Sequence, residues 1–227
     1  MYETNRLAGV DEGWWNPDFL LHREISRFLP AGPVARVLDY GAGNSPYRNR
    51  ISCEAYITAD ITQNVRCDID HLVRPGERLD LPDASFDLVL LLDVLEHVRD
   101  PGFVVGEVRR LLRKNGRVIV SLPFLYREHE TPNDYTRLTA FGAQELMARS
   151  GGTILRMKKV GNALYTLYTL FLERAILNGE HSELGAVGRA VNKFAIAALP
   201  ILRPVLAVPP SEQAGVYHHL LLDVSFP

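Results

Sequence analysis

Short apolar runs alternate with helical patterns over most of the chain. Strands are predicted at residues 34–39, 55–59, 65–67, 86–92, 117–122, 153–160 and 216–226. The run at 34–39 is typical of a strand buried on both faces, 86–92 is strongly apolar, and 65–67 is a weak strand. Apolar residues recur at helical spacing over residues 17–29, 101–113 and 139–150. Pro46 is placed to open a further helix, and the Lys114-Asn115-Gly116 stretch to end the second one. This alternation predicts an α/β fold with a doubly wound, mostly parallel seven-stranded sheet.

The segment between strands six and seven departs from the alternation. Residues 161–215 are rich in Leu, Ala and Tyr, and they predict an apolar insertion with helices at 162–177 and 185–199. Four interpretations remain open: an acceptor-binding cap, a surface that lies on a membrane, a homodimer interface, or an added helical layer. The expected organisation is an N-terminal helical cap over residues 1–33 and one domain over 34–227, which includes the insertion.

Composition narrows the class of protein. The net charge is -2 and the pI about 6.4, so no basic field gathers nucleic acid, and no nucleic-acid partner is expected. Cys53 and Cys67 lack metal-type spacing, which favours free thiols in a reducing compartment. The first 11 residues lack the apolar core of a signal peptide, and the longest uncharged run, 160–172, is too short to span a bilayer. A cytoplasmic protein is expected, with peripheral membrane contact left open by the insertion.

Acidic residues follow the predicted strands. Asp39, Asp60, Asp68 and Asp93 all stand at or just past strand ends, and ligands of such sheets bind at the carboxyl ends of the strands. A glycine turn at Gly41 and Gly43 follows the first strand. A dinucleotide site would place a third glycine where Pro46 stands, and the carboxylate of Asp39 would repel a pyrophosphate. The negative charge of this carboxylate favours a cationic ligand instead.

Asp60 has two interpretations. It lies 21 residues after Asp39, and a carboxylate there suits the two hydroxyls of a ribose. The alternative is that it caps the turn or helix that follows.

Three segments carry a family resemblance. The stretch Leu81-Pro82-Asp83-Ala84-Ser85-Phe86-Asp87, the stretch Asp93-Val94-Leu95-Glu96-His97-Val98, and the turn Arg113-Lys114-Asn115-Gly116-Arg117 resemble class I S-adenosylmethionine-dependent methyltransferases over residues 34–160. The subgroup with a "VLEH" motif, similar to glycan and cell-surface biosynthesis methyltransferases, is the nearest match. The resemblance implies a Rossmann-like fold, S-adenosylmethionine as cofactor and S-adenosylhomocysteine as product.

The resemblance also assigns cofactor-binding positions. It implies that Asp39, Gly41 and Gly43 line the methionine part, that Asp60 and Ile61 lie at the ribose, and that Asp93 lies near the reactive methyl. Asp68 would face the adenine amine, with Ile69 stacking nearby. Two departures are present: Ser45 replaces the usual third glycine, and the stretch 69–80 is long, so Glu77 or Asp80 is an alternative adenine acid.

Residues 123–139 carry the candidate chemistry. This stretch resembles the "H…P.DY.R.T" segment of glycan-pathway methyltransferases, and it follows strand five at the active-site edge. His129 is the candidate general base, because an imidazole titrates near neutrality; the alternative is that His129 and Asp134 hydrogen-bond the loop together. Tyr135 and Arg137 are expected to orient the loop or bind acceptor oxygens. With His129, the candidate catalytic residues are Asp93 and Tyr135.

A divalent metal site is a separate hypothesis. Asp93, Glu96 and His97 are similar to a metal-binding motif of some oxygen-methylating members, and His129 could add a ligand. The alternative is that Glu96 and His97 begin a helix. Trp14 and Trp15 are either a lid over the ligands or aromatic filling.

The sequence thus predicts transfer of a methyl group to an oxygen or nitrogen of a small molecule or of a glycan or lipid-linked precursor. The sequence leaves two alternative functions open: a nicotinamide-dependent oxidoreductase, and a non-catalytic binding member of the fold.

Overall fold

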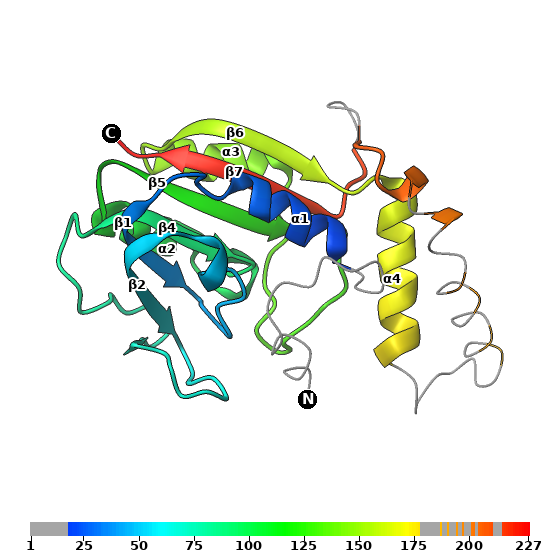
Figure 1. Ribbon diagram of the computed structural model, residues 1–227, viewed down its shortest axis with the longest axis horizontal. Coiled ribbons are helices and arrows are strands. Elements are labelled where there is room, and N and C mark those ends of the chain that lie inside the picture. Colours follow the sequence, from blue (N-terminus) through cyan, green and yellow to red (C-terminus); the bar gives the residue numbers. More distant parts are fainter. Residues whose placement is uncertain are drawn as a thin grey trace.

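The core of the protein is one mixed sheet (Figure 1). The computed structural model describes residues 18–177, 187, 190, 194, 197, 201–202, 204–210 and 215–227. Within them, seven strands pair in the order β3-β2-β1-β4-β5-β7-β6. The strands are β1 (Val34–Tyr40), β2 (Cys53–Asp60), β3 (His71–Leu72), β4 (Phe86–Leu92), β5 (Leu112–Pro123), β6 (Thr153–Val160) and β7 (His219–Ser225). Strands β1 to β5 pair in parallel, whereas β7 is antiparallel to both β5 and β6, which confirms the mostly parallel sheet.

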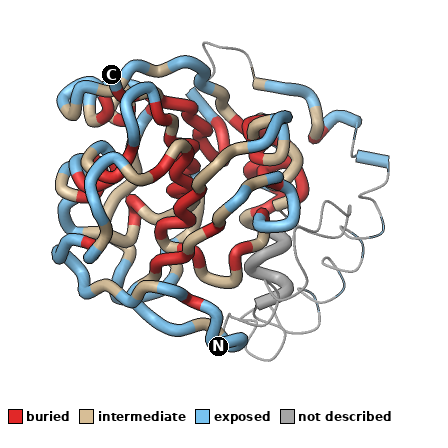
Figure 2. The backbone as a smooth tube through the Cα atoms, turned by 60° about the vertical axis from the view of Figure 1, so that its left-hand side comes forward, coloured by how far each residue is buried: buried red, intermediate tan, exposed pale blue. Residues whose placement is uncertain are grey.

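Helices cover both faces of the sheet. The helix α1 (Phe19–Phe28) packs on one face, and α2 (Pro101–Leu111) with α3 (Ala140–Arg149) on the other. Successive residues of a strand point to opposite faces, so Val37 joins the cluster under α1 while Leu38 joins the cluster under α2 and α3. The tube view shows the buried strands running through the middle of the molecule (Figure 2).

The second helix ends earlier than predicted. Asp100 caps α2 by accepting the Phe103 amide, but the helix stops at Leu111, and Lys114-Asn115-Gly116 belongs to β5. Tertiary contacts decide this boundary. The carbonyls of Arg110 and Leu111 accept the amides of Ala84 and Ser85, so they are not free to continue the helix.

The third strand is also displaced. Residues 65–67 were predicted to form it, yet the strand is His71–Leu72, and Asp68 lies in the preceding loop. Polar side chains hold that loop against the glycine turn: Asn64 donates to the Gly43 carbonyl over 2.8 Å and Arg66 donates to the Asn44 carbonyl over 2.6 Å. The helix predicted to open at Pro46 is not present among the described residues between β1 and β2. A single 3-10 turn, Arg48–Arg50, lies there instead.

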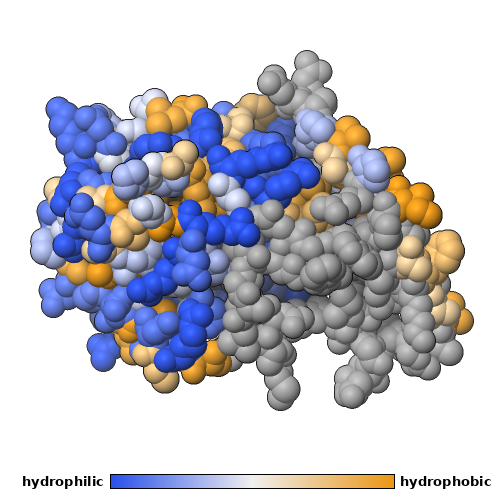
Figure 3. Space-filling model, in the orientation of Figure 1, coloured by the Kyte–Doolittle hydropathy of each residue, from blue (hydrophilic) through white to orange (hydrophobic). Residues whose placement is uncertain are grey.

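The insertion begins with α4 (Ala163–Leu177), which follows β6. Tyr165 and Tyr168 face the core, whereas Leu164 and Leu167 are more than half exposed. The side chain of Asn162 donates to the carbonyls of Val205 and Val208, so the described end of the insertion is tied to the start of α4. Apolar side chains gather along one side of the surface (Figure 3). The exposed large apolar residues in the described parts of 185–210 are Val187, Phe194, Ile201, Leu202, Val205 and Val208.

Parts of two expectations lie outside the described residues: the cap over residues 1–17, with Trp14 and Trp15, and most of the helix at 185–199. Among the described residues, no helix has the length and apolar character needed to cross a membrane.

Candidate active site

Two predicted acidic residues meet at the carboxyl edge of β1 and β2. In the parallel register Asp39 pairs with Thr58 and Tyr40 pairs with Ala59, so Asp60 follows one step beyond. Because both strands end at this edge, the two carboxylates stand on neighbouring strands beside the glycine turn. The predicted clustering of Asp39 and Asp60 is present in the fold.

Asp39 is buried at the start of the turn. Its side chain is 5% exposed and accepts a hydrogen bond of 2.7 Å from the Tyr56 hydroxyl. Burial raises the pKa of Asp39 to about 7, although the Tyr56 hydroxyl acts in the opposite direction. A carboxylate whose ionisation is suppressed in this way is poised to gain from a cationic ligand.

The glycine turn has the geometry of a ligand cradle. Gly41 and Gly43 have φ of 75° and 51°, the left-handed region that favours glycine. A Cβ on Gly41 would lie 2.4 Å from a Val94 methyl carbon, whereas a Cβ on Gly43 would meet no atom within 4 Å. The Asn44 side-chain oxygen is buried without a hydrogen-bond partner in the described chain. The open side at Gly43 and this unpaired oxygen fit a bound polar molecule.

Asp60 links the end of β2 to the glycine turn. Its Oδ2 accepts the Gly43 amide over 2.8 Å, and its Oδ1 accepts the amides of Ile61 and Thr62. The Asp60 carboxylate thus caps the backbone of the turn, as one of the two interpretations expected. The residue is half-buried at the end of β2, and its contact with a ribose stays a prediction.

The predicted adenine residues are more dispersed. Asp68 is exposed and pairs with Arg66 at 3.0 Å, while Ile69 is buried and Ile61 is 57% exposed. Glu77 and Asp80, the alternative acids, are both exposed on the long connection after β3. The adenine contact therefore stays a prediction.

Asp93 lies directly after β4 in a strained conformation. Its φ of 53° is unusual for a residue with a side chain. Its Oδ1 accepts the Ser121 hydroxyl over 2.6 Å and stands 3.7 Å from Nε2 of His219. Asp93 thus contacts β5 and β7, and it also lies near the cluster that contains Glu96 and His97, since its charge, after burial, helps to raise the pKa of Glu96.

Glu96, His97 and His129 form that cluster. Oε1 of Glu96 stands 3.6 Å from Nε2 of His97 and 3.8 Å from Nε2 of His129, and the two Nε2 atoms are 3.1 Å apart. The three groups lie within ligand distance of one another, and the Glu96 side chain is 1% exposed. Neither of its carboxylate oxygens has a hydrogen-bond partner in the described chain. Glu96 and His97 sit in a 3-10 turn, Leu95–His97, and do not begin an α-helix.

The outer nitrogens of both imidazoles are already committed. Nδ1 of His97 lies 2.7 Å from the Asn133 carbonyl, which only accepts, so this nitrogen donates. Nδ1 of His129 faces the Arg127 carbonyl and the Asp134 carboxylate, each at 3.3 Å, and donates there. Both neutral rings then direct a lone pair into the cluster. Burial, followed by the neighbouring His97, lowers the pKa of His129, and burial raises the pKa of Glu96 well above its usual range.

Asp134, Tyr135 and Arg137 hold the loop that carries His129. Asp134 accepts the His129 amide over 3.0 Å and pairs with the guanidinium of Arg137. Burial opposes ionisation of Asp134, but Arg137 and the His129 amide outweigh it and hold its pKa at about 2. Tyr135 bonds its hydroxyl to Asn133 and its amide to the Glu96 carbonyl. These contacts match the expected loop-orienting role.

Two functional candidates escaped the sequence prediction. His218 and His219 are buried at the start of β7, with their Nδ1 atoms 2.5 Å apart. The Tyr126 ring packs against His129, His218 and His219 at centroid distances of 5.0, 5.2 and 5.5 Å. The only feature of the sequence that could have pointed to these two residues is that two consecutive histidines stand in the last apolar run.

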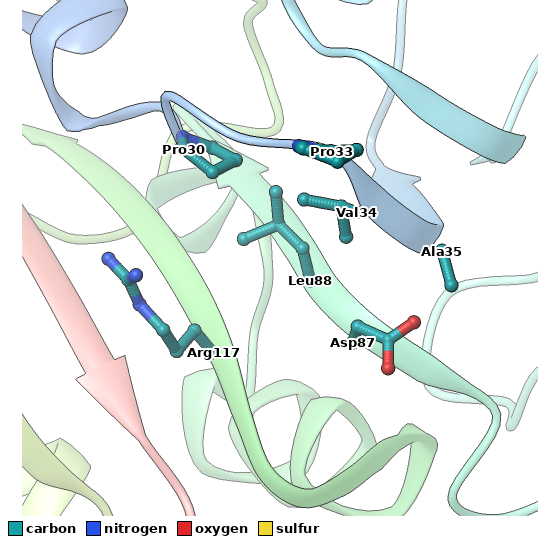
Figure 4. Close-up of a pocket in the computed structure, with 7 residues that line it drawn as sticks. All are labelled: Pro30, Pro33, Val34, Ala35, Asp87, Leu88 and Arg117. Carbon is teal, nitrogen blue, oxygen red and sulfur yellow. The ribbon is translucent and has the colours of Figure 1, made fainter.

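A cavity of about 310 Å³ lies elsewhere (Figure 4). Pro33, Val34 and Asp87 line it at the amino ends of β1 and β4, the opposite edge of the sheet from the acidic residues. It therefore plays no part in the candidate site.

Comparisons with known proteins now add to this geometry. The profile of the family described as "Methyltransferase domain" matches residues 38–120. The chain is 29% identical over 144 residues to a ubiquinone biosynthesis O-methyltransferase of Xylella fastidiosa, an alignment covering 52% of this chain and 58% of that protein. It is 30% identical over 147 residues to a probable S-adenosylmethionine-dependent methyltransferase of Mycobacterium tuberculosis, covering 60% of this chain and 52% of the relative.

Residues 38–120 carry a methyltransferase domain, and the named relatives support a class I S-adenosylmethionine-dependent methyltransferase. The family prediction and its cofactor, S-adenosylmethionine, are thereby confirmed, whereas the glycan-pathway subgroup stays a prediction. The match spans little more than half the length of these curated relatives. The solved structure of the [4+2]-cyclase SpnF shares the fold of this chain, with a TM-score of 0.62, 18% identity, and coverage of 91% of this chain and 80% of that one. The likeness to a cyclase shows that the fold alone does not fix the reaction.

Proposed function

We propose that the protein transfers the methyl group of S-adenosylmethionine to a hydroxyl oxygen of a small molecule or of a glycan or lipid-linked precursor. The observation that carries this proposal is the edge of the sheet at which Asp39, Asp60 and Asp93 lie at or just past the ends of their strands, beside a glycine turn with an open side at Gly43. Carboxylates favour a cationic nucleoside over a phosphate-bearing one, so a nicotinamide dinucleotide fits less well.

The chain's own groups would act by binding and orientation. Asp39 would balance the ammonium group of the cofactor, and Asp60 would accept ribose hydroxyls with the lone pairs that its three amide contacts leave. The sulfonium supplies a good leaving group, so alignment of the acceptor oxygen with the methyl is the main task of the protein. The neighbouring imidazoles and carboxylates suit an acceptor that must lose a proton, which favours oxygen over an uncharged amine.

We also propose that Glu96, His97 and His129 hold a divalent transition metal. Two nitrogens bound to one cation at about 2.1 Å stand roughly 3.0–3.4 Å apart, close to the separation of the two Nε2 atoms. One cation would stabilise both the facing Nε2 lone pairs of His97 and His129 and the buried Glu96 carboxylate, whose oxygens have no hydrogen-bond partner in the described chain. Two imidazoles with one carboxylate suit zinc, manganese or iron better than magnesium. When bound, such a cation would polarise an acceptor oxygen.

This assignment changes the predicted role of His129. As a ligand, its Nε2 lone pair is committed, and it is not available as the general base. Asp93 is left out of the ligand set, because its carboxylate bonds Ser121 instead.

The exposed apolar face of the insertion supports a third element, contact with an anionic membrane. Val187, Phe194 and Ile201 are each at least two-thirds exposed at helical spacing. Residues 184–211 contain Arg189, Lys193 and Arg203 but no acidic residue. The basic composition of this segment complements an anionic lipid surface.

Isothermal titration with S-adenosylmethionine, S-adenosylhomocysteine and a nicotinamide dinucleotide tests the cofactor. We expect binding of the first two only, and affinity for the dinucleotide alone would refute the proposal. Incubation with methyl-labelled S-adenosylmethionine and a panel of phenols, sugars and lipid-linked sugars then tests transfer. Cofactor binding without transfer to any extracted cellular metabolite would favour the non-catalytic alternative.

A further inference from the structure

His218 presents a buried nitrogen whose partner is missing from the described chain. The residue is fully buried, yet its Nε2 has no hydrogen-bond partner among the described residues. A buried polar atom of this kind costs free energy unless a ligand or water satisfies it. The nitrogen therefore marks a position at which a bound molecule gains a hydrogen bond.

The backbone fixes this imidazole rigidly at the edge of the sheet. The His218 amide donates to the Val160 carbonyl over 2.9 Å, and its carbonyl accepts the Phe124 amide over 2.8 Å. The ring packs edge-on against Tyr126 and Tyr165 at 5.2 and 5.4 Å. Gly161 permits this approach, because a Cβ there would lie 2.3 Å from a Tyr165 ring carbon. His218 thus stands between the ends of β5 and β6, beside the loop that carries His129.

The neighbouring groups determine which nitrogen of His218 carries its proton. Nε2 of His219 faces the Asp93 carboxylate at 3.7 Å, which favours a proton on that nitrogen. Nδ1 of His219 then accepts, and Nδ1 of His218 donates across the 2.5 Å contact. The lone pair of a neutral His218 is consequently on Nε2, the buried atom without a partner.

Charge and burial keep His218 in the form that accepts a proton. Burial lowers the pKa of His218 well below its usual range, the neighbouring His219 lowers it further, and Asp93 acts in the opposite direction. The neutral imidazole is the form that a general base requires.

We propose that His218 is the general base for the acceptor hydroxyl, with His219 and Asp93 as positioning residues. This inference rests on the proposed methyl transfer. The acceptor oxygen forms a bond to the methyl carbon as the bond from carbon to sulfur breaks, and the electron pair stays on sulfur. The hydroxyl proton moves to Nε2 of His218. The positive charge lost by the sulfonium then resides on the imidazolium, which His219 bonds and the Asp93 carboxylate balances.

The first test is the position of the protons, which needs no known acceptor. Long-range proton-nitrogen spectra of the nitrogen-15-labelled full chain, with S-adenosylhomocysteine added, report each imidazole nitrogen at pH 7. We expect His218 to be neutral with its proton on Nδ1, and His219 to carry its proton on Nε2. A cationic His218, or one protonated on Nε2, overturns the proposal. An Asp93→Asn change should lower the share of His219 protonated on Nε2; an unchanged share removes Asp93 from the positioning role.

The second test is kinetic and uses an acceptor from the labelled-methyl panel. His218→Gln should lower kcat about 10²- to 10⁴-fold with little change in S-adenosylmethionine affinity. The control His22→Gln, on α1, should leave kcat unchanged. A folded His218→Gln variant with normal kcat overturns the base assignment while the methyltransferase proposal survives. If wild type transfers no methyl, the proposed function fails instead. If the variant does not fold, the proton positions in wild type still decide the question.

Discussion

Nε2 of His97 and Nε2 of His129 face each other at 3.1 Å, although both rings use their other nitrogen to donate outward. Two lone pairs at this distance repel unless a proton or a cation lies between them. The buried Glu96 carboxyl, whose Oε1 lies 3.6 and 3.8 Å from these atoms, adds oxygen lone pairs at the same point, and a cation there would favour its ionised form. The site is therefore predicted to gain stability from a cation.

Metal binding is the first prediction. Adding zinc or manganese to chelator-treated protein should raise its Tm, since a ligand that binds only the folded state stabilises it by about 2.7 kcal/mol at 100 times its Kd. Glu96→Gln and His129→Gln should each remove the metal-dependent rise, while His22→Gln should retain it. Differential scanning calorimetry, with metal content measured after dialysis, would disprove the site if wild type and Glu96→Gln respond alike.

The second prediction concerns the pH dependence of cofactor affinity. The pKa of Asp39 is about 7 without ligand, and a cationic ligand favours its ionised form, so binding should release a proton below pH 7. Affinity for S-adenosylmethionine should thus rise by up to about tenfold per pH unit between pH 5 and 7, then level off. Titration calorimetry in two buffers of different ionisation enthalpy measures the released proton. Asp39→Asn should flatten the profile; a wild-type profile that is itself flat contradicts the role of Asp39.

The two glycines of the turn are expected to respond differently to a methyl group. Gly41→Ala places its Cβ against Val94 at positive φ and should cost about 1–3 kcal/mol of unfolding free energy. Gly43→Ala meets open space and should cost only about 1 kcal/mol, yet it should weaken cofactor binding at least tenfold. Denaturant unfolding and calorimetry separate the two effects. Normal cofactor affinity in Gly43→Ala would show that the cofactor does not approach this side of the turn.

Asp60 offers a test of the ribose contact. Asp60→Ala should weaken S-adenosylmethionine binding by about 1–3 kcal/mol, which is the range for hydrogen bonds to a charged group. Asp60→Asn keeps only one of the two oxygens that accept backbone amides, so it should retain part of the hydrogen bonding of the turn and lose a smaller part of the affinity. If both variants bind the cofactor as tightly as wild type, Asp60 is a structural cap only.

Membrane contact is the fifth prediction. The protein should cosediment with vesicles of phosphatidylglycerol and phosphatidylcholine more strongly than with phosphatidylcholine alone, and added salt should weaken the effect. Phe194→Glu and Ile201→Glu should reduce binding at least tenfold. Phe141→Glu is the matched control: Phe141 is 81% exposed on α3, outside the insertion, so this change should leave vesicle binding unaltered. A concentration-dependent dimer that Phe194→Glu dissociates, without vesicle binding, would assign the face to a second copy.

The local sequence predicted six of the seven strands and the strand-end positions of Asp39 and Asp60. The sequence located β4 and β6 at their observed bounds. For β4 the reason is that a strand buried on both faces is a continuous apolar run. The sequence also placed Asp39 and Asp60 at strand ends beside the glycine turn, since parallel strands end at one edge.

Tertiary structure decided the rest. The end of α2 and the position of β3 depend on hydrogen bonds to distant segments, such as Ala84 to Arg110 and Asn64 to Gly43, which no local pattern encodes. His219 meets Asp93 only because β7 runs antiparallel beside β5, which sets His219 opposite Pro123. His97 and His129 are 32 residues apart, and only the folded loop turns their lone pairs toward each other. Strands follow from local periodicity, whereas contacts between loops follow from the topology of the whole sheet.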